Sequence, residues 1–587
     1  MKSKSRMPKT GRLLTLVLAV SVFLSGCMMD ASRYRDLVDK WLSGGTEKSE
    51  LTVPQYNTEN GLVPFSKMEY ERPDAEAVTQ RLSNLGFKMR TCASFEELKP
   101  YIEEMELLYD WYCTMMNLAE IHHKTDMSDT FWAEECVYLA ENEPALTSEY
   151  DSCYAFLYDS AYREQIAENF GDAYFDHIWE EDVYYTDKVI ELLAEEARLC
   201  EEYGRILSSA SVQFGDTSYT YYDIYAVEDT DTYSDLLWRW YAAHYNRIAK
   251  LYISLVQVRQ RIAEESGFDH YTEYLFSREK DYTPQSFEAL LDEIAEELGP
   301  LYLEAWWYEP DETISFDTCS TFLQNAFGEM SPALRSGFEQ MLACDLIGYE
   351  PESHKYGGAS TYDLYSYRSP YILMSYTEDF YSIGTLVHEF GHAYAAMQTD
   401  DLYETTDMSE VYSQTLELLL SNHYDSLYSD ESAEAAKQAE VLNMLDTIVY
   451  QAYFAAVEFA VYAEDSNSLT PQRLGEIAGE QACRFGLTDV SDDEYYQKDW
   501  IGTTHLFEFP FYVTGYVSSA CVALQVWQLS LTDEAQAVRI YDRMIQRTES
   551  RNFVENVTAA GLESPFESGI IRRIKPVFAS CLEKAAA

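Results

Sequence analysis

Basic residues are scarce in this sequence. Lysine and arginine together number 42, against 101 aspartates and glutamates, so the formal net charge of the 587 residues is −59. No basic stripe is therefore available to neutralise phosphates, which excludes a nucleic-acid partner. The simplest consequence of the acidic surface is solubility through self-repulsion.

Closely spaced cysteines are also missing. The chain has 11 cysteines, but they are scattered along the sequence and no two form a CxxC pair. This excludes a cysteine-ligated zinc site. Most of these cysteines are expected to be small buried side chains.

Long apolar runs are missing too, since no stretch of 18 or more apolar residues offers a transmembrane helix. The shorter apolar core Leu13 to Leu24 follows a cationic region and leads into Leu24-Ser25-Gly26-Cys27. This pattern resembles a bacterial lipoprotein signal. We expect residues 1–26 to be a signal peptide and Cys27 to carry the lipid that anchors the protein outside the cytoplasm, at the cell membrane. The alternative is an ordinary secretory signal with an incidental cysteine.

Glycine and proline are sparse between about residues 65 and 195. Apolar residues recur there at three- and four-residue spacing, as in Phe95 to Leu118, which predicts long helices. The chain is too long for one small core and indicates more than one unit. We expect a mainly α fold with a tether over residues 27–64, a helical N-terminal domain over 65–199 and a second domain over 200–587.

The second domain contains His388-Glu389-Phe390-Gly391-His392 within a run of helical periodicity from Asp379 to Met397. Two histidines four apart share one face of a helix and can present two nitrogens to a single zinc ion. Glu389 can then reach a water in the open position of the metal. A chance HExxH in a chain this poor in histidine has a probability of about one per cent. The motif predicts a metallohydrolase with one zinc ion per chain.

A second helix is predicted from Met408 to Tyr424. Glu410, Ser413 and Glu417 fall three and four apart there and form one polar stripe among apolar residues. A catalytic zinc takes three protein ligands, so one glutamate can complete the site while the other orients a ligand histidine. The spacing does not choose between Glu410 and Glu417. Two solvated glutamates are the alternative.

Aromatic residues gather near the only late histidine. Between Trp500 and Tyr516, His505, Tyr512 and Tyr516 could supply hydrogen-bond donors to an oxyanion beside the metal. Plain core aromatics are the alternative.

The residue pattern changes between Lys355 and Tyr376, where Gly357-Gly358 precedes alternating runs rich in tyrosine and serine. We expect a short strand over Tyr371 to Tyr376 that leads into the metal helix. Its edge could pair with an extended peptide backbone, or the strand could be a structural hairpin that covers the site.

Several of these motifs occur together in a known family. From about residue 200 to 575 the chain resembles oligoendopeptidase F, of the thimet-oligopeptidase group of zinc peptidases. The motifs that carry the resemblance are Val256 to Arg261 with Ile262-Ala263-x-x-x-Gly267-Phe268-x-x-Tyr271, Gly357-Gly358-Ala359, Pro370-Tyr371-Ile372-Leu373, the HEFGH helix, Glu410-Val411-x-Ser413, the His505 to Tyr516 cluster, and Ala559-Ala560-Gly561-Leu562-x-Ser564-Pro565.

The resemblance implies a role for each residue around the metal. His388 and His392 match the zinc histidines of the family, and Glu389 matches its general base. Glu410 matches the third ligand, because the ligand opens the pattern that Glu410-Val411-x-Ser413 repeats. Glu417 then becomes the residue that orients a ligand histidine.

On the substrate side, the resemblance implies that His505 and Tyr516 bind substrate and the oxyanion, with Tyr512 as a helper. It implies a two-lobed helical ellipsoid with a deep channel that admits short peptides, and a small β-sheet beside the metal helix. The chain departs from the family in Ala393-Tyr394-Ala395-Ala396, where relatives usually have another histidine.

The resulting prediction is a monomeric zinc endopeptidase that acts on short peptides. A preference for basic peptides is the alternative to solubility as the meaning of its acidic surface. The competing prediction is a lipid-anchored protein that binds peptides in the same channel without cutting them. A zinc protease of a different group, acting on whole proteins, is a further alternative.

Overall fold

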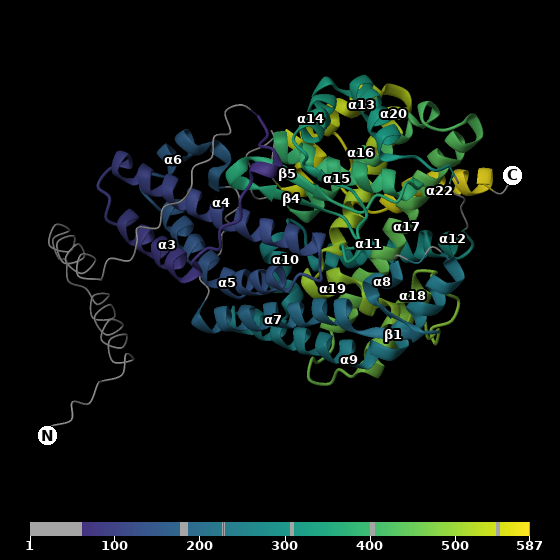
Figure 1. The fold of residues 1–587 in the computed structure, drawn as a ribbon, viewed down its shortest axis with the longest axis horizontal. Helices are drawn as coiled ribbons and strands as arrows, with labels where there is room; N and C mark the ends of the chain where they lie inside the picture. Colours follow the sequence, from purple (N-terminus) through teal and green to yellow (C-terminus); the bar gives the residue numbers. More distant parts are fainter. Residues whose placement is uncertain are drawn as a thin grey trace.

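The computed structural model describes residues 61–175, 186–225, 227, 229–305, 310, 312–398, 405–546 and 552–585. The predicted signal peptide, Cys27 and the tether up to residue 60 lie outside the described residues. Most of the described chain is helical (Figure 1). The predicted mainly α fold is therefore confirmed.

The N-terminal part is built from helices, and all of them except the short α6 have a side chain that caps the start. They are α3 (Ala75–Met89), α4 (Phe95–Thr125), α5 (Thr130–Tyr158), α6 (Arg163–Phe170) and α7 (Asp187–Ser209). Asp74, Ser94, Asp129 and Thr186 each accept a hydrogen bond from a backbone N–H in the first turn of the helix that follows. Such caps satisfy donors that the helix itself leaves free.

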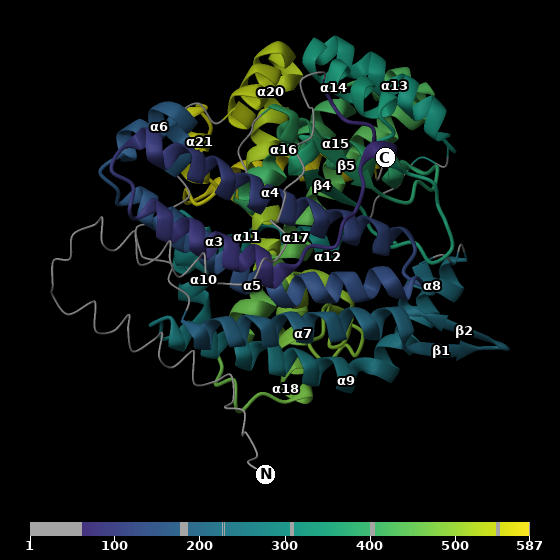
Figure 2. The same cartoon turned by 60° about the vertical axis from the view of Figure 1, so that its left-hand side comes forward.

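Helix α9 (Thr230–Glu265) packs along α7. Between them the chain forms the hairpin of β1 (Ser211–Phe214) and β2 (Thr217–Thr220), followed by the short helix α8 (Tyr221–Tyr225). Figure 2 shows the hairpin projecting near one end of the α7 and α9 pair. The domain boundary predicted at residue 199/200 falls inside α7, and that division stays a prediction.

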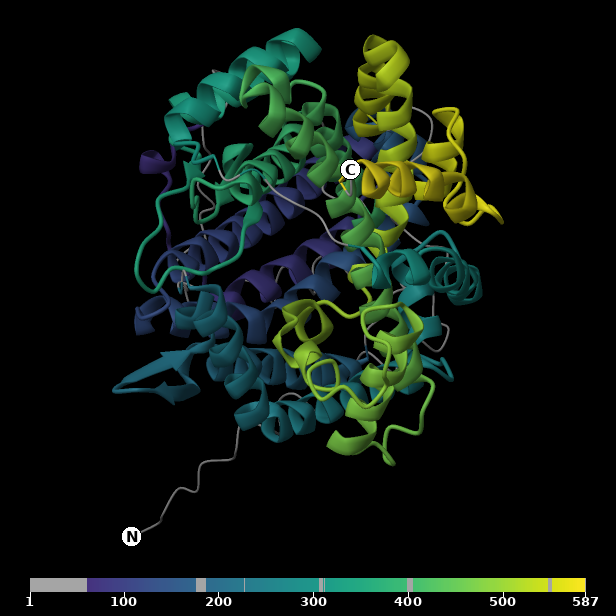
Figure 3. The ribbon, with the colours of Figure 1, turned by 90° about the vertical axis from the view of Figure 1, so that its right-hand side faces the viewer.

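The rest of the described chain is again mostly helical, and Figure 3 shows its C-terminal helices gathered on one side of the molecule. The helices are α10 (Tyr271–Glu279), α11 (Pro284–Glu297), α12 (Gly299–Leu303), α13 (Phe316–Met330), α14 (Pro332–Ala343), α15 (Phe380–Gln398), α16 (Thr406–Ser421), α17 (Asp430–Tyr462), α18 (Pro471–Arg484), α19 (Thr504–Glu508), α20 (Val513–Gln546), α21 (Phe553–Ala559) and α22 (Ile570–Ala585).

A three-stranded sheet lies against α15. Its order is β3 (Ile347–Gly348), β5 (Ser369–Leu373) and β4 (Ser360–Leu364), with β5 parallel to β3 and antiparallel to β4. Every residue of β5 is buried, and both β4 and β5 contact α15. The predicted small sheet beside the metal helix is confirmed, with its strand ending at Leu373 rather than Tyr376.

Four helices, α15, α16, α17 and α20, pack against one another where the sequence predicts the site. Helix α16 packs against both α15 and α20, and α17 packs against α20.

Among the described residues, α17 is the one helix long and apolar enough to span a membrane, but 72% of its most apolar window is buried inside the protein. Burial of that kind is typical of a core helix.

Candidate metal centre

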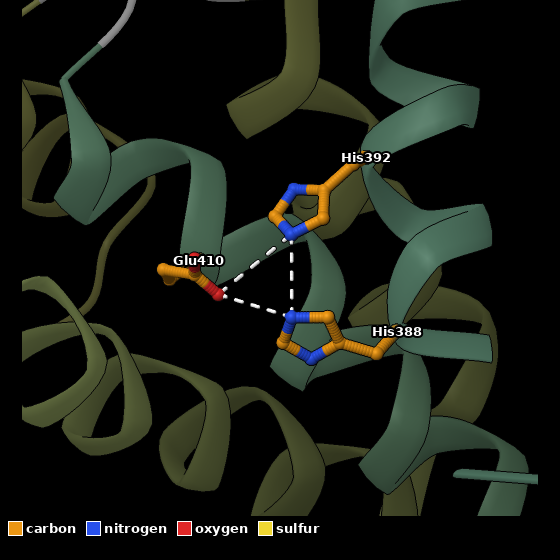
Figure 4. A group of neighbouring side chains, drawn as sticks. All are labelled: His388, His392 and Glu410. Atoms are coloured by element: carbon orange, nitrogen blue, oxygen red, sulfur yellow. Dashed lines mark hydrogen bonds and ion pairs between the residues drawn. The ribbon is translucent and has the colours of Figure 1, made fainter. Parts of the chain in front are cut away.

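The two histidines of the HExxH motif and Glu410 point toward one another (Figure 4). His388 and His392 lie one turn apart on α15, and Glu410 lies on α16. The Nε2 atoms of the two histidines are 3.3 Å apart. Glu410 Oε2 lies 3.3 Å from His388 Nε2 and 3.8 Å from His392 Nε2.

This triangle has the size that a zinc ion requires. Zinc bonds to histidine nitrogen and carboxylate oxygen are about 2.0–2.1 Å long, so tetrahedral ligand atoms lie about 3.3–3.4 Å apart. Two edges of the triangle match that spacing, and the third is 3.8 Å. These three side chains could therefore hold zinc with little movement, and a fourth position would remain for a water or a substrate.

The approach of α15 to α16 depends on Gly391. A Cβ added to this glycine would lie 2.6 Å from Ser413 Cα and 2.9 Å from the carbonyl oxygen of Tyr412. Only glycine allows the two backbones to come so close at this point. The glycine inside the HEFGH motif thus brings Glu410 within reach of the two histidines.

Both ligand histidines are held at their Nδ1 atoms. Glu417 Oε1 lies 2.8 Å from His388 Nδ1, and Ser409 Oγ lies 3.0 Å from His392 Nδ1. Partners of this kind fix the ring orientation and direct Nε2 at the metal position. The two glutamates that spacing left undecided thus differ in the structure, since Glu410 faces Nε2 of both rings and Glu417 faces Nδ1 of one.

Glu410 is itself held by two hydroxyl groups. Ser413 Oγ donates to its Oε2 at 3.0 Å, and Tyr512 Oη donates to its Oε1 at 2.8 Å. Burial acts to raise the pKa of the Glu410 carboxyl, but the nearby His392 and His388 rings lower it to about 2. The carboxyl is therefore ionised at neutral pH, as a zinc ligand must be.

Glu389 lies beside the triangle and is only 7% exposed. Burial raises the pKa of its carboxyl above the ordinary range. The hydroxyl of Thr361, on β4, donates to Glu389 Oε2 at 2.7 Å. The sheet thus fixes one oxygen of this carboxylate.

His505, Tyr512 and Tyr516 come together near Glu410. Tyr512 contacts Glu410 Oε1, whereas the two ligand histidines face Glu410 Oε2. Tyr516 Oη lies 3.3 Å from His505 Nε2, and the ring centroids of Tyr512 and Tyr516 are 5.4 Å apart. Burial lowers the pKa of His505 and raises those of both tyrosines, so these groups are uncharged at neutral pH. Neutral hydroxyl groups can donate hydrogen bonds to a developing oxyanion.

These three residues do not lie on one helix. His505 belongs to α19 and Tyr516 to α20, and between them Phe511 adopts a positive φ of 59°. Residues seven and four apart in sequence would share one face of a continuous helix, but here they lie on a short helix, a turn and the start of a long helix.

Two related protein families match this sequence and together cover most of the described chain. The family described as peptidase family M3 matches residues 334–576, and the peptidase M3 N-terminal domain matches residues 65–183. The chain belongs to peptidase family M3. The resemblance to zinc peptidases that the motifs indicated is thereby confirmed at the level of the family.

Named M3 relatives are similar over part of their length. Oligopeptidase PepF of Bacillus subtilis is 26% identical over 208 residues, which make up 33% of this chain and 30% of that protein. The oligoendopeptidase F homolog of Mycoplasma pneumoniae is 25% identical over 243 residues, or 37% of this chain and 39% of that protein. The matched region thus spans less than half of either curated relative.

Solved structures of oligoendopeptidase F and of PZ peptidase A share the fold of this chain over most of its length. An oligoendopeptidase F structure has a TM-score of 0.81 at 23% identity and covers 89% of this chain and 99% of its own. PZ peptidase A with an inhibitor gives 0.80 at 21% identity over 89% and 99%. An oligoendopeptidase F from Bacillus anthracis gives 0.77 at 21% identity over 89% and 98%. At these identities the likeness shows the fold alone.

The M3 match from residue 334 to 576 contains every predicted site residue of the described chain. Sequence reasoning missed Ser409 and Thr361, which hold His392 and Glu389. Neither residue is part of a sequence motif, because each contacts its partner only through tertiary packing. Ser409 has one signal, its place directly before the predicted ligand Glu410.

Proposed function

We propose that this M3 peptidase is a zinc-dependent endopeptidase. The observation that carries the proposal is the triangle of His388 Nε2, His392 Nε2 and Glu410 Oε2, with edges of 3.3 to 3.8 Å, beside the buried carboxylate of Glu389. This arrangement supplies three protein ligands, one open position and a base, which is what a zinc hydrolase needs.

When bound, a zinc ion supplies Lewis acidity, which makes a water more acidic and a peptide carbonyl more electrophilic. Glu389 takes the proton from the attacking water and later passes it to the leaving amine. Burial raises the pKa of its carboxyl, which makes it a stronger proton acceptor than an exposed glutamate. Tyr516 and His505 donate hydrogen bonds to the oxyanion, and Tyr512 supports them while it holds Glu410.

We propose short peptides as the substrates. Support comes from the names of the relatives, one an oligopeptidase and the other an oligoendopeptidase F homolog. The deep channel implied by the family resemblance would admit such peptides and exclude folded proteins. A panel of quenched peptides of increasing length, tested beside casein, checks this; efficient digestion of casein would point to a protease that acts on whole proteins.

The mechanism is tested by substituting Glu389 with glutamine. We expect the variant to bind one zinc ion per chain and to lose turnover of quenched peptides, because an amide cannot accept the proton. The parent should lose activity with a chelator and regain it with zinc. If the zinc-loaded parent bound peptides and cut none, the chain would be a peptide-binding protein instead.

We also propose that the protein is anchored to the bacterial membrane through a lipid on Cys27. The support is the residue pattern of the first 27 residues, with a cationic region, an apolar core and a lipobox-like end. The parent should incorporate labelled palmitate and sediment with membranes. Cys27→Ser should abolish the label; retention of the label would refute this assignment.

A further inference from the structure

We propose that Arg259 and Glu458 are positioning residues for the oxyanion side of the site. The proposal rests on the peptidase function proposed above, since their role is to place His505, Tyr512 and Tyr516. Both side chains are 0% exposed, so a peptide cannot reach them. They come from α9 and α17, two helices that carry none of the metal-facing residues.

The segment that carries His505 needs support from outside. Helix α19 has only five residues, and the side chain of its N-cap residue Thr503 makes no capping hydrogen bond. The last carbonyl groups of any helix have no partner within it. The chain then turns at Phe511, whose φ of 59° lies in the left-handed region that disfavours bulky side chains. Interactions with other helices must therefore hold this turn.

Arg259 holds the end of α19. Its Nη1 donates to the carbonyl oxygen of Leu506 at 3.1 Å, and its Nη2 donates to the carbonyl oxygen of Phe507. Its Nε donates to Glu196 Oε1 at 2.5 Å, which fixes the guanidinium plane. A planar guanidinium can bond two successive carbonyls, which a lysine cannot do with the same geometry. Arg259 thus satisfies the carbonyls that directly follow His505.

Glu458 holds the turn itself. The backbone N–H of Phe511 donates to both carboxylate oxygens of Glu458, at 3.0 and 3.1 Å. The Phe511 ring is 0% exposed and packs between the rings of Phe459 and Tyr462, with centroids 5.0 and 5.4 Å away. The next residue, Tyr512, reaches Glu410 at 2.8 Å. The unusual backbone at Phe511 is therefore anchored where the chain enters the site.

A shift of this segment should affect turnover more than substrate binding. The donors on it act on charge that exists only in the transition state. A misplacement of about 1 Å can reduce a rate by about 100-fold without removing any catalytic group. We therefore expect variants at Arg259 and Glu458 to lower kcat and to change KM little.

The experiment compares four variants of the zinc-loaded, full chain. Glu458→Leu keeps the volume and removes the acceptor, whereas Glu458→Gln keeps one acceptor oxygen. Arg259→Lys keeps the positive charge and loses the planar guanidinium that bonds two carbonyl groups at once. Glu135→Leu is the matched control, because Glu135 is a buried carboxylate on α5, 1% exposed, far along the chain from the site.

We expect Glu458→Leu to lower kcat by about 10- to 100-fold, with Glu458→Gln close to the parent and Arg259→Lys in between. A phosphinic peptide, whose tetrahedral group mimics the oxyanion, should lose affinity in proportion to kcat/KM. Glu135→Leu should lower thermal stability and leave kcat and this affinity unchanged.

The proposal would be overturned if Glu458→Leu kept the kcat and the phosphinic-peptide affinity of the parent. It would also be overturned if the loss of kcat and affinity equalled the fraction of the variant that is unfolded. If Glu458→Leu does not fold, Arg259→Lys decides in the same way. If the parent cuts no peptide, the proposed function fails and a crystal structure of Glu458→Leu or Arg259→Lys decides. A displaced Tyr512 hydroxyl then supports positioning, and an unchanged contact with Glu410 refutes it.

Discussion

Replacing Gly391 with alanine should open the metal centre. The added Cβ would meet Ser413 Cα at 2.6 Å and the Tyr412 carbonyl oxygen at 2.9 Å, both of them backbone atoms of α16. Carbon atoms in proteins ordinarily approach to about 3.5–4.0 Å. The two helices must therefore separate by about 1 Å at their crossing.

This separation acts on the metal triangle. His388 and His392 move with α15 and Glu410 moves with α16, so the two edges of 3.3 and 3.8 Å that join the helices lengthen. Overpacking of this kind costs about 1–3 kcal/mol of folding free energy. We expect zinc affinity, measured by competition with a chromogenic chelator, to fall by about 10- to 100-fold.

Gly384 provides the matched control on the same helix. A Cβ there would meet only Glu417 Oε2, at an ordinary 3.9 Å, and alanine favours the helix by up to about 1 kcal/mol. Gly384→Ala should therefore keep parent-like zinc affinity and melt at the same temperature or higher. Parent-like zinc affinity in Gly391→Ala would refute the inference that this crossing sets the distance between the ligands.

Three further variants test single contacts. Thr361→Val removes the hydroxyl that holds Glu389 and should lower kcat about tenfold with zinc content unchanged, as metal analysis beside a peptide assay would check; an unchanged kcat contradicts this. Ser409→Ala frees Nδ1 of His392 and should weaken zinc binding about tenfold in chelator competition, and a parent-like dissociation constant contradicts it. Burial raises the pKa of Asp499 to about 7, so the folded state holds a proton that the unfolded state releases near pH 4. Asp499 should therefore contribute a loss of stability of at most about 1.4 kcal/mol per pH unit as pH rises from about 4 to 7, and the fall of stability with pH in urea unfolding should be shallower in Asp499→Asn than in the parent; equal slopes refute it.

The metal side of the site could be predicted because it depends on local periodicity. Two histidines four apart on a helix must share a face, and Glu410 falls on a stripe that the next helix turns toward the core. Spacing could not separate Glu410 from Glu417, because residues seven apart lie on the same stripe. Their difference is set by the crossing of α15 and α16, which depends on the backbone contact at Gly391.

The structure brings His505, Tyr512 and Tyr516 together, but not on one helix, and their role toward an oxyanion stays a prediction. The spacing of His505, Tyr512 and Tyr516 resembles one helix, whereas Phe511 interrupts it with a left-handed backbone. The backbone N–H of Phe511 is bound there by the buried carboxyl group of Glu458, 53 residues earlier in the sequence. Local sequence cannot predict a contact with a residue that only tertiary packing brings near. For the same reason, the contacts of Thr361 and Ser409 could not be predicted.

The three side chains that could hold the metal come from one pair of consecutive helices, α15 and α16, while the proposed donors to the oxyanion come from a separate segment about a hundred residues later. The two halves are joined at one point, because Tyr512, the residue after Phe511, donates to Glu410. Damage to the turn at Phe511 in a homologue should therefore also loosen a metal-facing carboxylate, so loss of bound metal would accompany loss of the turn.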